Sequence, residues 1–465
     1  MTDRRRFLVR LTVITVIAAI GRVVYSVAVA DPRVRDVKLS DQVFYHLQAR
    51  AVADGWGFVN PFAFYAKGSA QRVIDTALHP PLYTTFLAIP ARFGIDSMLS
   101  QRVITSLLGA ATVFLLGLLG RAIGGNRIGL LAAGIAAVAP ALWVNDSVLG
   151  LETLYCFLVV VALLALYSFW DRPRISAAIG LALALGLASL TRSEGPILFV
   201  LLALPTVLLK HGLAWRDRAK YLGVMALVGA LVVGPWVVRN LTTFDEPTYL
   251  GTGFGLVLAY GNCDRTYSGE LLGYWSDQCG YNDYAPRTEE SVVDLRARKQ
   301  GTDYLRDHLG RLPVVVAARV GRVWSVFRPT QDVHLDAFYE RRGTAESWAV
   351  LVAYYLMLAL SIAGMVVLRR RRIPIFPYLA IALSVTITVA LSFGITRYRA
   401  PVDVVMPLLS AVAIDAFLRW RRNAPDGAPG GTGRAGTGTP DLPPPTAASA
   451  PATLEAHEGT SSLPG

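Results

Sequence analysis

Residues 11–30 read LTVITVIAAIGRVVYSVAVA, a mostly apolar run that follows the basic triplet Arg4–Arg6. A helix needs about 20 apolar residues to cross a hydrocarbon core of about 30 Å, so this run predicts a membrane-spanning helix. Nine further apolar runs follow: Arg102–Gly120, Ile128–Val144, Leu149–Trp170, Ile175–Leu190, Pro196–Leu209, Tyr221–Val238, Trp348–Leu368, Pro374–Ile395 and Val402–Leu418. With 53% hydrophobic residues, the chain is expected to be an all-α polytopic membrane protein of about ten transmembrane helices.

Basic clusters beside these runs predict the orientation, because Lys and Arg accumulate on the cytoplasmic side. The clusters are Arg4–Arg6, Arg121 with Arg127, Asp171–Arg174, Lys210–Lys220, Arg369–Arg372 and Arg419–Arg422. They alternate with the predicted spans so that both termini are cytoplasmic, in a multi-pass protein of the cell membrane. The net charge of +12 then reflects topology, and we expect no nucleic-acid partner.

This topology divides the chain into segments: 1–30, the first transmembrane helix; 31–101, a first external loop with amphipathic surface helices; 102–238, helices two to seven; 239–347, an external segment that caps a site; 348–422, helices eight to ten; and 423–465, a cytoplasmic tail. The tail is rich in Pro, Gly, Ala and Thr and is expected to be disordered. A rival prediction has the first helix cleaved after Ala28-Val29-Ala30.

Polar clusters lie at the outer ends of the apolar runs. They are Lys38–His46 around Asp41, His79-Pro80-Pro81-Leu82-Tyr83, Leu190–Gly195, Pro235–Asn240 and Arg397-Tyr398-Arg399. The run after Gly195 has fourteen residues, about 21 Å of helix, so the turn at Arg192–Gly195 is expected to lie recessed in a pocket. Together the clusters predict one extracytoplasmic site.

In their order, these clusters resemble the polytopic glycosyltransferases of the GT-C fold that use lipid-linked sugars. The likeness is closest to the bacterial branch related to aminoarabinose and protein-mannosyl transferases, and it spans residues 11–418. It also includes Ala53–Phe58 and Leu-Glu-Thr-Leu at Leu151. The resemblance implies a GT-C fold and transfer of a sugar from a polyprenyl-phosphate donor to an envelope lipid, glycan or protein acceptor.

The resemblance also implies residue roles. Asp41 matches the acid that serves as catalytic base, and the residues matching the lipid-phosphate site are His79, Arg192, Arg239, Arg397 and Arg399. Many relatives carry two acids where this chain has Asp41 and Gln42, so transfer without a metal or other cofactor is favoured over a divalent-metal mechanism. Tyr45, Glu152 and Glu194 complete the candidate site.

Sugar transfer needs a base for the acceptor hydroxyl and cations for the departing phosphate. A free Asp has a pKa of about 3.9, so a base that works near neutrality would gain from partial burial that raises this pKa. Arginine suits the phosphate because its planar fork binds two oxygens and stays charged. Direct displacement at the anomeric carbon inverts its configuration.

Each candidate also has a structural alternative. Asp41 could be a helix cap, Glu152 could favour a helix dipole, and His79 could be a rigid-turn residue. Arg192 and Glu194 could neutralise one another, and Arg239 could be an interfacial anchor beside Trp236.

Two other functions remain open, a transporter or flippase of a lipid-linked sugar and a silent scaffold. Polar residues at the outer ends, without a repeat, favour the enzyme. Cys263 and Cys279 lie outside, where they could either pair as a disulfide or stay free, whereas Cys156 is expected to pack as a small hydrophobe.

Overall fold

Helices account for all the regular structure in the described part of this computed structural model, apart from one isolated bridge between Val59 and Asp75. The structure describes residues 2–30, 40–66, 72–280, 288–340 and 342–423. The predicted all-α class is confirmed. The predicted disordered tail lies outside the described residues except for Asn423, which is the last residue of α21.

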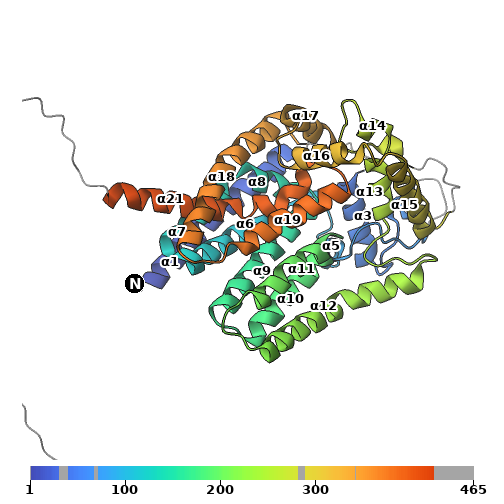
Figure 1. Ribbon diagram of the computed structural model, residues 1–465. Helices are drawn as coiled ribbons and strands as arrows, with labels where there is room; N and C mark the ends of the chain where they lie inside the picture. Colours follow the sequence, from blue (N-terminus) through green and yellow to red (C-terminus); the bar gives the residue numbers. More distant parts are fainter. Residues whose placement is uncertain (1, 31–39, 67–71, 281–287, 341, 424–465) are drawn as a thin grey trace, which may run out of the picture. The chain divides into compact units, whose positions relative to one another are not determined.

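Each of the ten predicted spans corresponds to a helix or to a bent helix pair (Figure 1). Five helices are long and apolar enough to cross a membrane: α1 (Asp3–Tyr25, continued by η1, Ser26–Ala30), α6 (Met98–Gly124), α9 (Glu152–Asp171), α12 (Trp215–Thr243) and α18 (Thr344–Arg370). Three are shorter: α10 (Ile175–Ser189), α11 (Gly195–Leu208) and α19 (Phe376–Leu391). The number of spans stays a prediction, since these criteria give five among the described residues, or seven with the bent pairs.

The two bent pairs replace helices that were predicted to be continuous. α7 (Asn126–Val138) and α8 (Pro140–Asp146) meet at 58°, because Pro140 cannot continue the preceding helix and Ala139 before it is extended. η3 (Thr396–Arg399) and α20 (Ala400–Asp403) meet α21 (Met406–Asn423) at 48°, where a proline again occupies the first turn of the new helix. Both breaks lie beside the candidate site.

The two segments that were predicted to be external, called here the first loop and the second external segment, contain further helices. The first loop contains α3 (Asp41–Ala53), α4 (Pro61–Phe64) and α5 (Leu82–Ala91). The second external segment contains α13 (Phe254–Gly261), α14 (Asp264–Tyr267), η2 (Asp277–Cys279), α15 (Glu290–Asp307), α16 (Leu312–Val323) and α17 (Pro329–Tyr339). A disulfide joins Cys263 to Cys279, and Cys156 is a buried free thiol.

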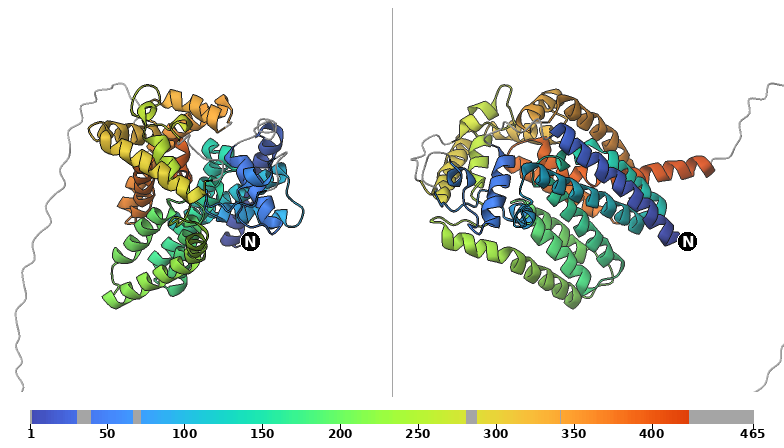
Figure 2. Two further views of the ribbon diagram at one scale, coloured as in Figure 1. Left: turned by 90° about the vertical axis from the view of Figure 1, so that its right-hand side faces the viewer. Right: turned by 180° about the vertical axis from the view of Figure 1, so that it is seen from behind.

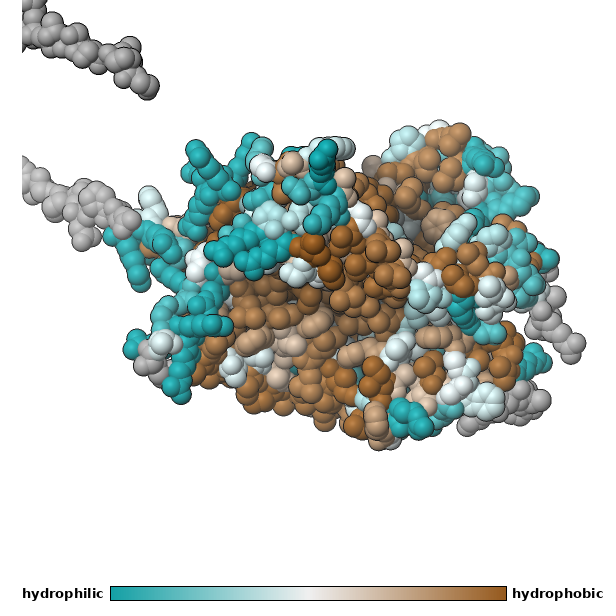
Figure 3. Space-filling view, turned by 90° about the horizontal axis from the view of Figure 1, so that it is seen from below, coloured by the Kyte–Doolittle hydropathy of each residue, from teal (hydrophilic) through white to brown (hydrophobic). Residues whose placement is uncertain are grey.

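Within the compact unit that ends at Arg422, α6 packs against α1, α7 and α9, and α10 packs between α9 and α12. The N-terminus and α21 lie at one end of the long helices, and α3, α13 and α15 lie at the other end (Figures 1 and 2). Hydrophobic side chains cover the middle of the face in Figure 3, with hydrophilic ones gathered toward both ends. This pattern suits helices whose middles contact lipid.

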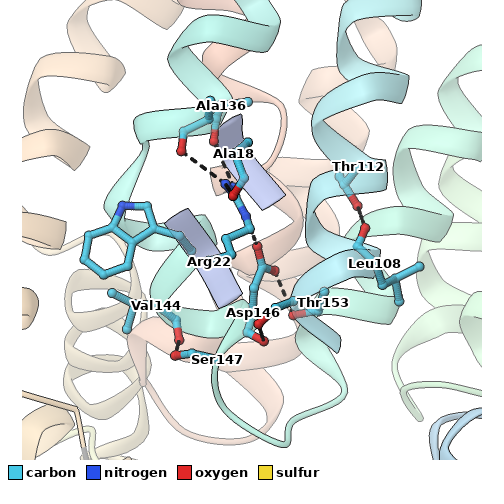
Figure 4. A network of polar contacts seen from close by, with 12 residues as sticks. Ala18, Arg22, Leu108, Thr112, Ala136, Val144, Asp146, Ser147 and Thr153 are labelled. Carbon is cyan, nitrogen blue, oxygen red and sulfur yellow. Dashed lines mark hydrogen bonds and ion pairs between the residues drawn. The ribbon is translucent and has the colours of Figure 1, made fainter. Parts of the chain in front are cut away.

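A charged pair lies buried among these helices (Figure 4). Arg22 on α1 donates from Nε to Asp146 on α8 at 2.7 Å, and its Nη2 donates to the Ala136 carbonyl at 3.1 Å. The other Asp146 oxygen accepts from Thr153 at 2.9 Å. Because both side chains are at most 7% exposed, each charge depends on the other for compensation.

We expect Asp146→Asn, which keeps the side-chain shape but leaves the Arg22 charge unpaired, to lower the free energy of unfolding by about 3–5 kcal/mol. Adding Arg22→Met removes the stranded charge, so the double variant should recover part of that loss. Thermal unfolding of the purified protein in detergent measures both. Strictly additive losses would contradict a direct charge pair.

Candidate active site where helix ends meet

Asp41 is the first residue of α3 and not its cap. Ser40 is the N-cap, and its hydroxyl accepts from the Val43 backbone N–H at 3.4 Å. The capping alternative for Asp41 is therefore wrong, and its carboxylate is left to face a different partner. The Asp41 side chain is 47% exposed, which keeps it accessible to a substrate.

Arg397, in η3, is that partner. It donates from Nη1 to Asp41 at 2.9 Å and from Nε to Glu152 at 2.5 Å. A third carboxylate, Glu340 at the C-cap of α17, lies 3.6 Å from Nη1. One guanidinium thus brings together the ends of α3, α9 and α17, which are far apart in the sequence.

Glu152, the first residue of α9, accepts from two arginines through the same oxygen. Arg192 Nη1 donates to it at 2.8 Å, and Arg397 Nε donates from the other side. Arg192 also bonds Glu194 through Nε and lies with its guanidinium 5.0 Å from the Tyr398 ring centroid. The alternative of Arg192–Glu194 neutralisation describes a real ion pair, but it is part of a larger network that reaches Arg397.

His79 lies against the aromatic side chains of α3. Its ring centroid is 5.0 Å from that of Phe44 and 4.9 Å from that of Tyr45, and its Nε2 is 4.0 Å from Asp41 Oδ1. The Tyr45 hydroxyl is buried and has no hydrogen-bond partner within the described residues. The ring that carries this unpaired hydroxyl lies beside His79.

The loop that carries His79 is held from the second external segment. Glu290, on α15, accepts from the Thr76 hydroxyl at 2.6 Å and from the Ala77 N–H at 3.0 Å, and it also bonds Thr252. This carboxylate fixes the backbone just before His79 and ties the first loop to the capping segment.

The charges around Asp41 control its protonation. The surrounding protein partly desolvates the Asp41 carboxyl, which raises its pKa, but Arg397, together with His79 when its ring is protonated, outweighs that effect and holds the pKa below its usual value. Asp41 therefore does not have the raised pKa from which a base that works near neutrality would gain. Burial lowers the pKa of His79, against the opposing effect of Asp41, so at neutral pH His79 is uncharged and can donate one N–H.

The contacts of Arg239 are with the first loop and not with the Asp41 cluster. It donates to Asp75 at 2.6 Å and to the Thr76 carbonyl at 3.3 Å, and its guanidinium lies 5.1 Å from the Trp236 ring centroid. These contacts favour the anchoring alternative, since they use the arginine to hold the loop that leads to His79.

Arg399 also departs from its predicted place. Its side chain is 1% exposed and donates to Asp403 at 3.0 Å, to Ser325 at 2.8 Å and to the Val323 carbonyl at 3.0 Å. Its guanidinium lies 3.5 Å from the Tyr354 ring centroid. With these partners, Arg399 is a core residue that supports η3, and we leave it out of the site proposed below.

Sequence reasoning missed four residues that shape the site. They are Gly150, Glu290, Glu340 and Arg342. The three charged ones lie in or beside polar helices of the second external segment, where many similar charges are solvated, and no spacing distinguishes them. A Cβ on Gly150 would lie 2.5 Å from Glu152 Oε2, a constraint that appears only in three dimensions.

Comparison with known protein families finds one match. Residues 78–238 match the family model described as dolichyl-phosphate-mannose-protein mannosyltransferase. This match confirms the predicted resemblance to the glycosyltransferases that use lipid-linked sugars. No curated protein sequence matches the chain.

Solved structures of low sequence identity are also similar. The Archaeoglobus fulgidus oligosaccharyltransferase tethered with an acceptor peptide is 17% identical, with 91% of this chain and 51% of that chain covered and a TM-score of 0.49. ArnT from Cupriavidus metallidurans bound to undecaprenyl phosphate is 16% identical, with 88% and 79% covered and a TM-score of 0.40. The chain spans about half the length of the archaeal oligosaccharyltransferase.

We expect Gly150→Ala to lower sugar transfer about tenfold or more, because the added methyl group displaces Glu152 and with it Arg397, and small misplacements in a site are costly. Gly134→Ala is the matched control, since a Cβ there meets nothing within 4 Å. Initial rates and melting temperatures are measured for both variants. Equal rates for the two, at equal stability, would show that Gly150 does not protect the network.

Proposed function

We propose that the chain catalyses inverting transfer of a sugar from a polyprenyl-phosphate donor to a cell-envelope acceptor, a lipid, glycan or protein, at the outer face of the cytoplasmic membrane. The observation that carries the proposal is the contact of Asp41 with Arg397, which joins a solvent-accessible carboxylate to a cation at one point. Glycosyl transfer from a phosphate needs both groups close together.

In the proposed reaction, Asp41 takes the proton of the acceptor hydroxyl. The acceptor oxygen attacks the anomeric carbon, the bond from that carbon to the phosphate oxygen breaks, and polyprenyl phosphate leaves with the bonding electrons. The attack comes from the face opposite the phosphate, so the configuration inverts. Because the pKa of Asp41 is held low, the carboxylate is ionised at neutral pH and acts as an acceptor without prior deprotonation.

Two side chains are placed to bind the departing phosphate. Arg397 supplies a positive charge and hydrogen-bond donors, and uncharged His79 supplies one N–H beside it. Arg192 acts on the phosphate only through Glu152 in this arrangement, since both of its bonded partners are carboxylates. The external segment that contains α13 to α17 then forms the roof of the site.

The neighbour of Asp41 supports transfer without a metal. Gln42 is buried, and its side-chain oxygen accepts from the Leu149 N–H at 3.3 Å and from Arg102 at 3.4 Å. This side chain fixes α3 against the helix bundle and does not stand beside Asp41 as a second ligand. The proposal therefore includes no cofactor.

A flippase for the same lipid-linked sugar is the competing function. Sealed vesicles that contain the purified protein and a fluorescent polyprenyl-phosphate sugar separate the two functions. The enzyme yields a covalent acceptor product, detected by mass spectrometry, whereas a flippase moves the lipid across the bilayer without forming any product.

We expect Asp41→Asn to reduce transfer at least 10²-fold, the usual scale for losing a general base, without weakening the binding of undecaprenyl phosphate. Transfer is followed with a polyprenyl-phosphate sugar and an envelope extract as acceptor. Asp96→Asn is the matched control, because Asp96 pairs with Arg50 at a half-exposed position away from Arg397. Near-normal transfer by the Asp41 variant, at normal abundance, would remove Asp41 from the proposed role.

A further inference from the structure

The charge balance of the site conflicts with binding a phosphate. Four carboxylates, those of Asp41, Glu152, Glu194 and Glu340, surround the guanidinium groups of Arg192 and Arg397. If all are ionised, the cluster carries two negative charges. A lipid phosphate would enter against this field unless one carboxylate moves or takes up a proton.

The three carboxylates on Arg397 are not held equally. Asp41 and Glu152 accept hydrogen bonds from it at 2.9 and 2.5 Å, whereas Glu340 stays 3.6 Å from Nη1 in an ion pair without a hydrogen bond. Glu340 and Arg397 are both 18% exposed, so solvent reaches this contact. Of the three carboxylates, Glu340 therefore loses the least interaction energy when it moves away from Arg397.

One N–H donor group of Arg397 has no acceptor among the described residues. Among the described residues, its Nη2 donates no hydrogen bond. A phosphate binds arginine best through two parallel N–H donors. The Nη1 and Nη2 pair provides them once Glu340 withdraws from Nη1.

We propose that Glu340 occupies the place of the donor phosphate on Arg397 in the ligand-free protein, and that phosphate binding displaces it. The inference rests on the proposed function and adds to it a carboxylate that competes with the substrate. Glu340 acts through Arg397 and sets how tightly the site holds a phosphate.

Arg342 is placed to receive the displaced carboxylate. It lies two residues beyond Glu340, attracts it electrostatically, and donates from Nη2 to Asn145 at 2.5 Å. Its Nε is buried without a hydrogen-bond partner, and it forms no ion pair among the described residues. A short movement of the α17 end would give this unused donor a carboxylate.

The same contact should respond to pH. Burial raises the pKa of Glu340, and Glu152 and Asp336 raise it further, while Arg397 and Arg342 oppose the rise. A protonated Glu340 competes less with the phosphate for Arg397. Glu340→Gln should therefore bind the phosphate more tightly than wild type at high pH, and this difference should disappear as the pH falls through the pKa of Glu340. The ratio of the wild-type and Glu340→Gln dissociation constants cancels the titration of the phosphate itself.

The test measures the dissociation constant for undecaprenyl phosphate on full-length protein in nanodiscs, with uncharged undecaprenol as the control lipid. Glu340→Gln should bind the phosphate about three- to tenfold more tightly at pH 8, the scale of one partly screened charge contact, and should not change binding of undecaprenol. Glu194→Gln is the matched control, because it alters the cluster charge equally but does not contact Arg397. The increase in phosphate affinity for Glu194→Gln should be less than half of that for Glu340→Gln.

The outcomes separate this inference from the proposed function. One outcome overturns the inference and leaves the proposed function standing: wild type binds the phosphate, Arg397→Gln does not, and Glu340→Gln binds it no more tightly than wild type. Equal increases in phosphate affinity for Glu340→Gln and Glu194→Gln also overturn it, because the overall negative charge of the cluster would then explain both. No phosphate binding by any variant overturns both. Glu340→Ala, which also removes the carboxylate, gives a second test if the Gln variant fails to fold.

A double-mutant cycle with Glu340 tests the role of Arg342. Arg342→Gln should weaken phosphate binding in the wild-type background, because displaced Glu340 loses its new partner, and should have little effect in the Glu340→Gln background. Equal weakening in both backgrounds would show that Arg342 binds the phosphate directly and would contradict its role as the acceptor of Glu340.

Discussion

The bond network of Arg397 is the constraint on which the site depends. One guanidinium holds Asp41 from the first loop and Glu152 from the start of α9, and Glu340 approaches from the second external segment. These residues come from helix ends that no local interaction brings together. Because a guanidinium is planar and always charged, it fixes both the position of its partners and the ionised state of the base. The same residue, Arg397, therefore determines both where the Asp41 carboxylate lies and that it is ionised.

A second charged pair supports this arrangement from inside the helix bundle. Asp146 links Arg22 on α1 to Thr153, the neighbour of Glu152, and the adjacent Asn145 accepts from Arg342. The break at Pro140 changes the direction of the chain by 58°, and α8, which begins there, packs against α9. A continuous helix through this segment would carry Asp146 elsewhere. The irregular part of the bundle thus positions the site, as is usual where a backbone departs from a regular helix at a functional position.

Sequence patterns were sufficient for the fold class, for the positions of the apolar helices and for the meeting of Asp41, His79, Glu152, Arg192 and Arg397. Long apolar runs and basic flanks are strong local signals. The same reasoning could not sort the arginines, because Arg397, Arg239 and Arg399 look alike in sequence and differ only in the partners that surround them. It also could not give the direction of the Asp41 pKa shift, because that direction depends on the contact with Arg397, which lies 356 residues away in the sequence.

A structure determined in a nanodisc with undecaprenyl phosphate would show which side chains bind the phosphate. We predict the phosphate within hydrogen-bond distance of Arg397 Nη1 and Nη2, with Asp41 still beside the guanidinium and Glu340 withdrawn toward Arg342. A phosphate held by Arg239 or Arg399, with the Arg397 contacts unchanged, would contradict this prediction.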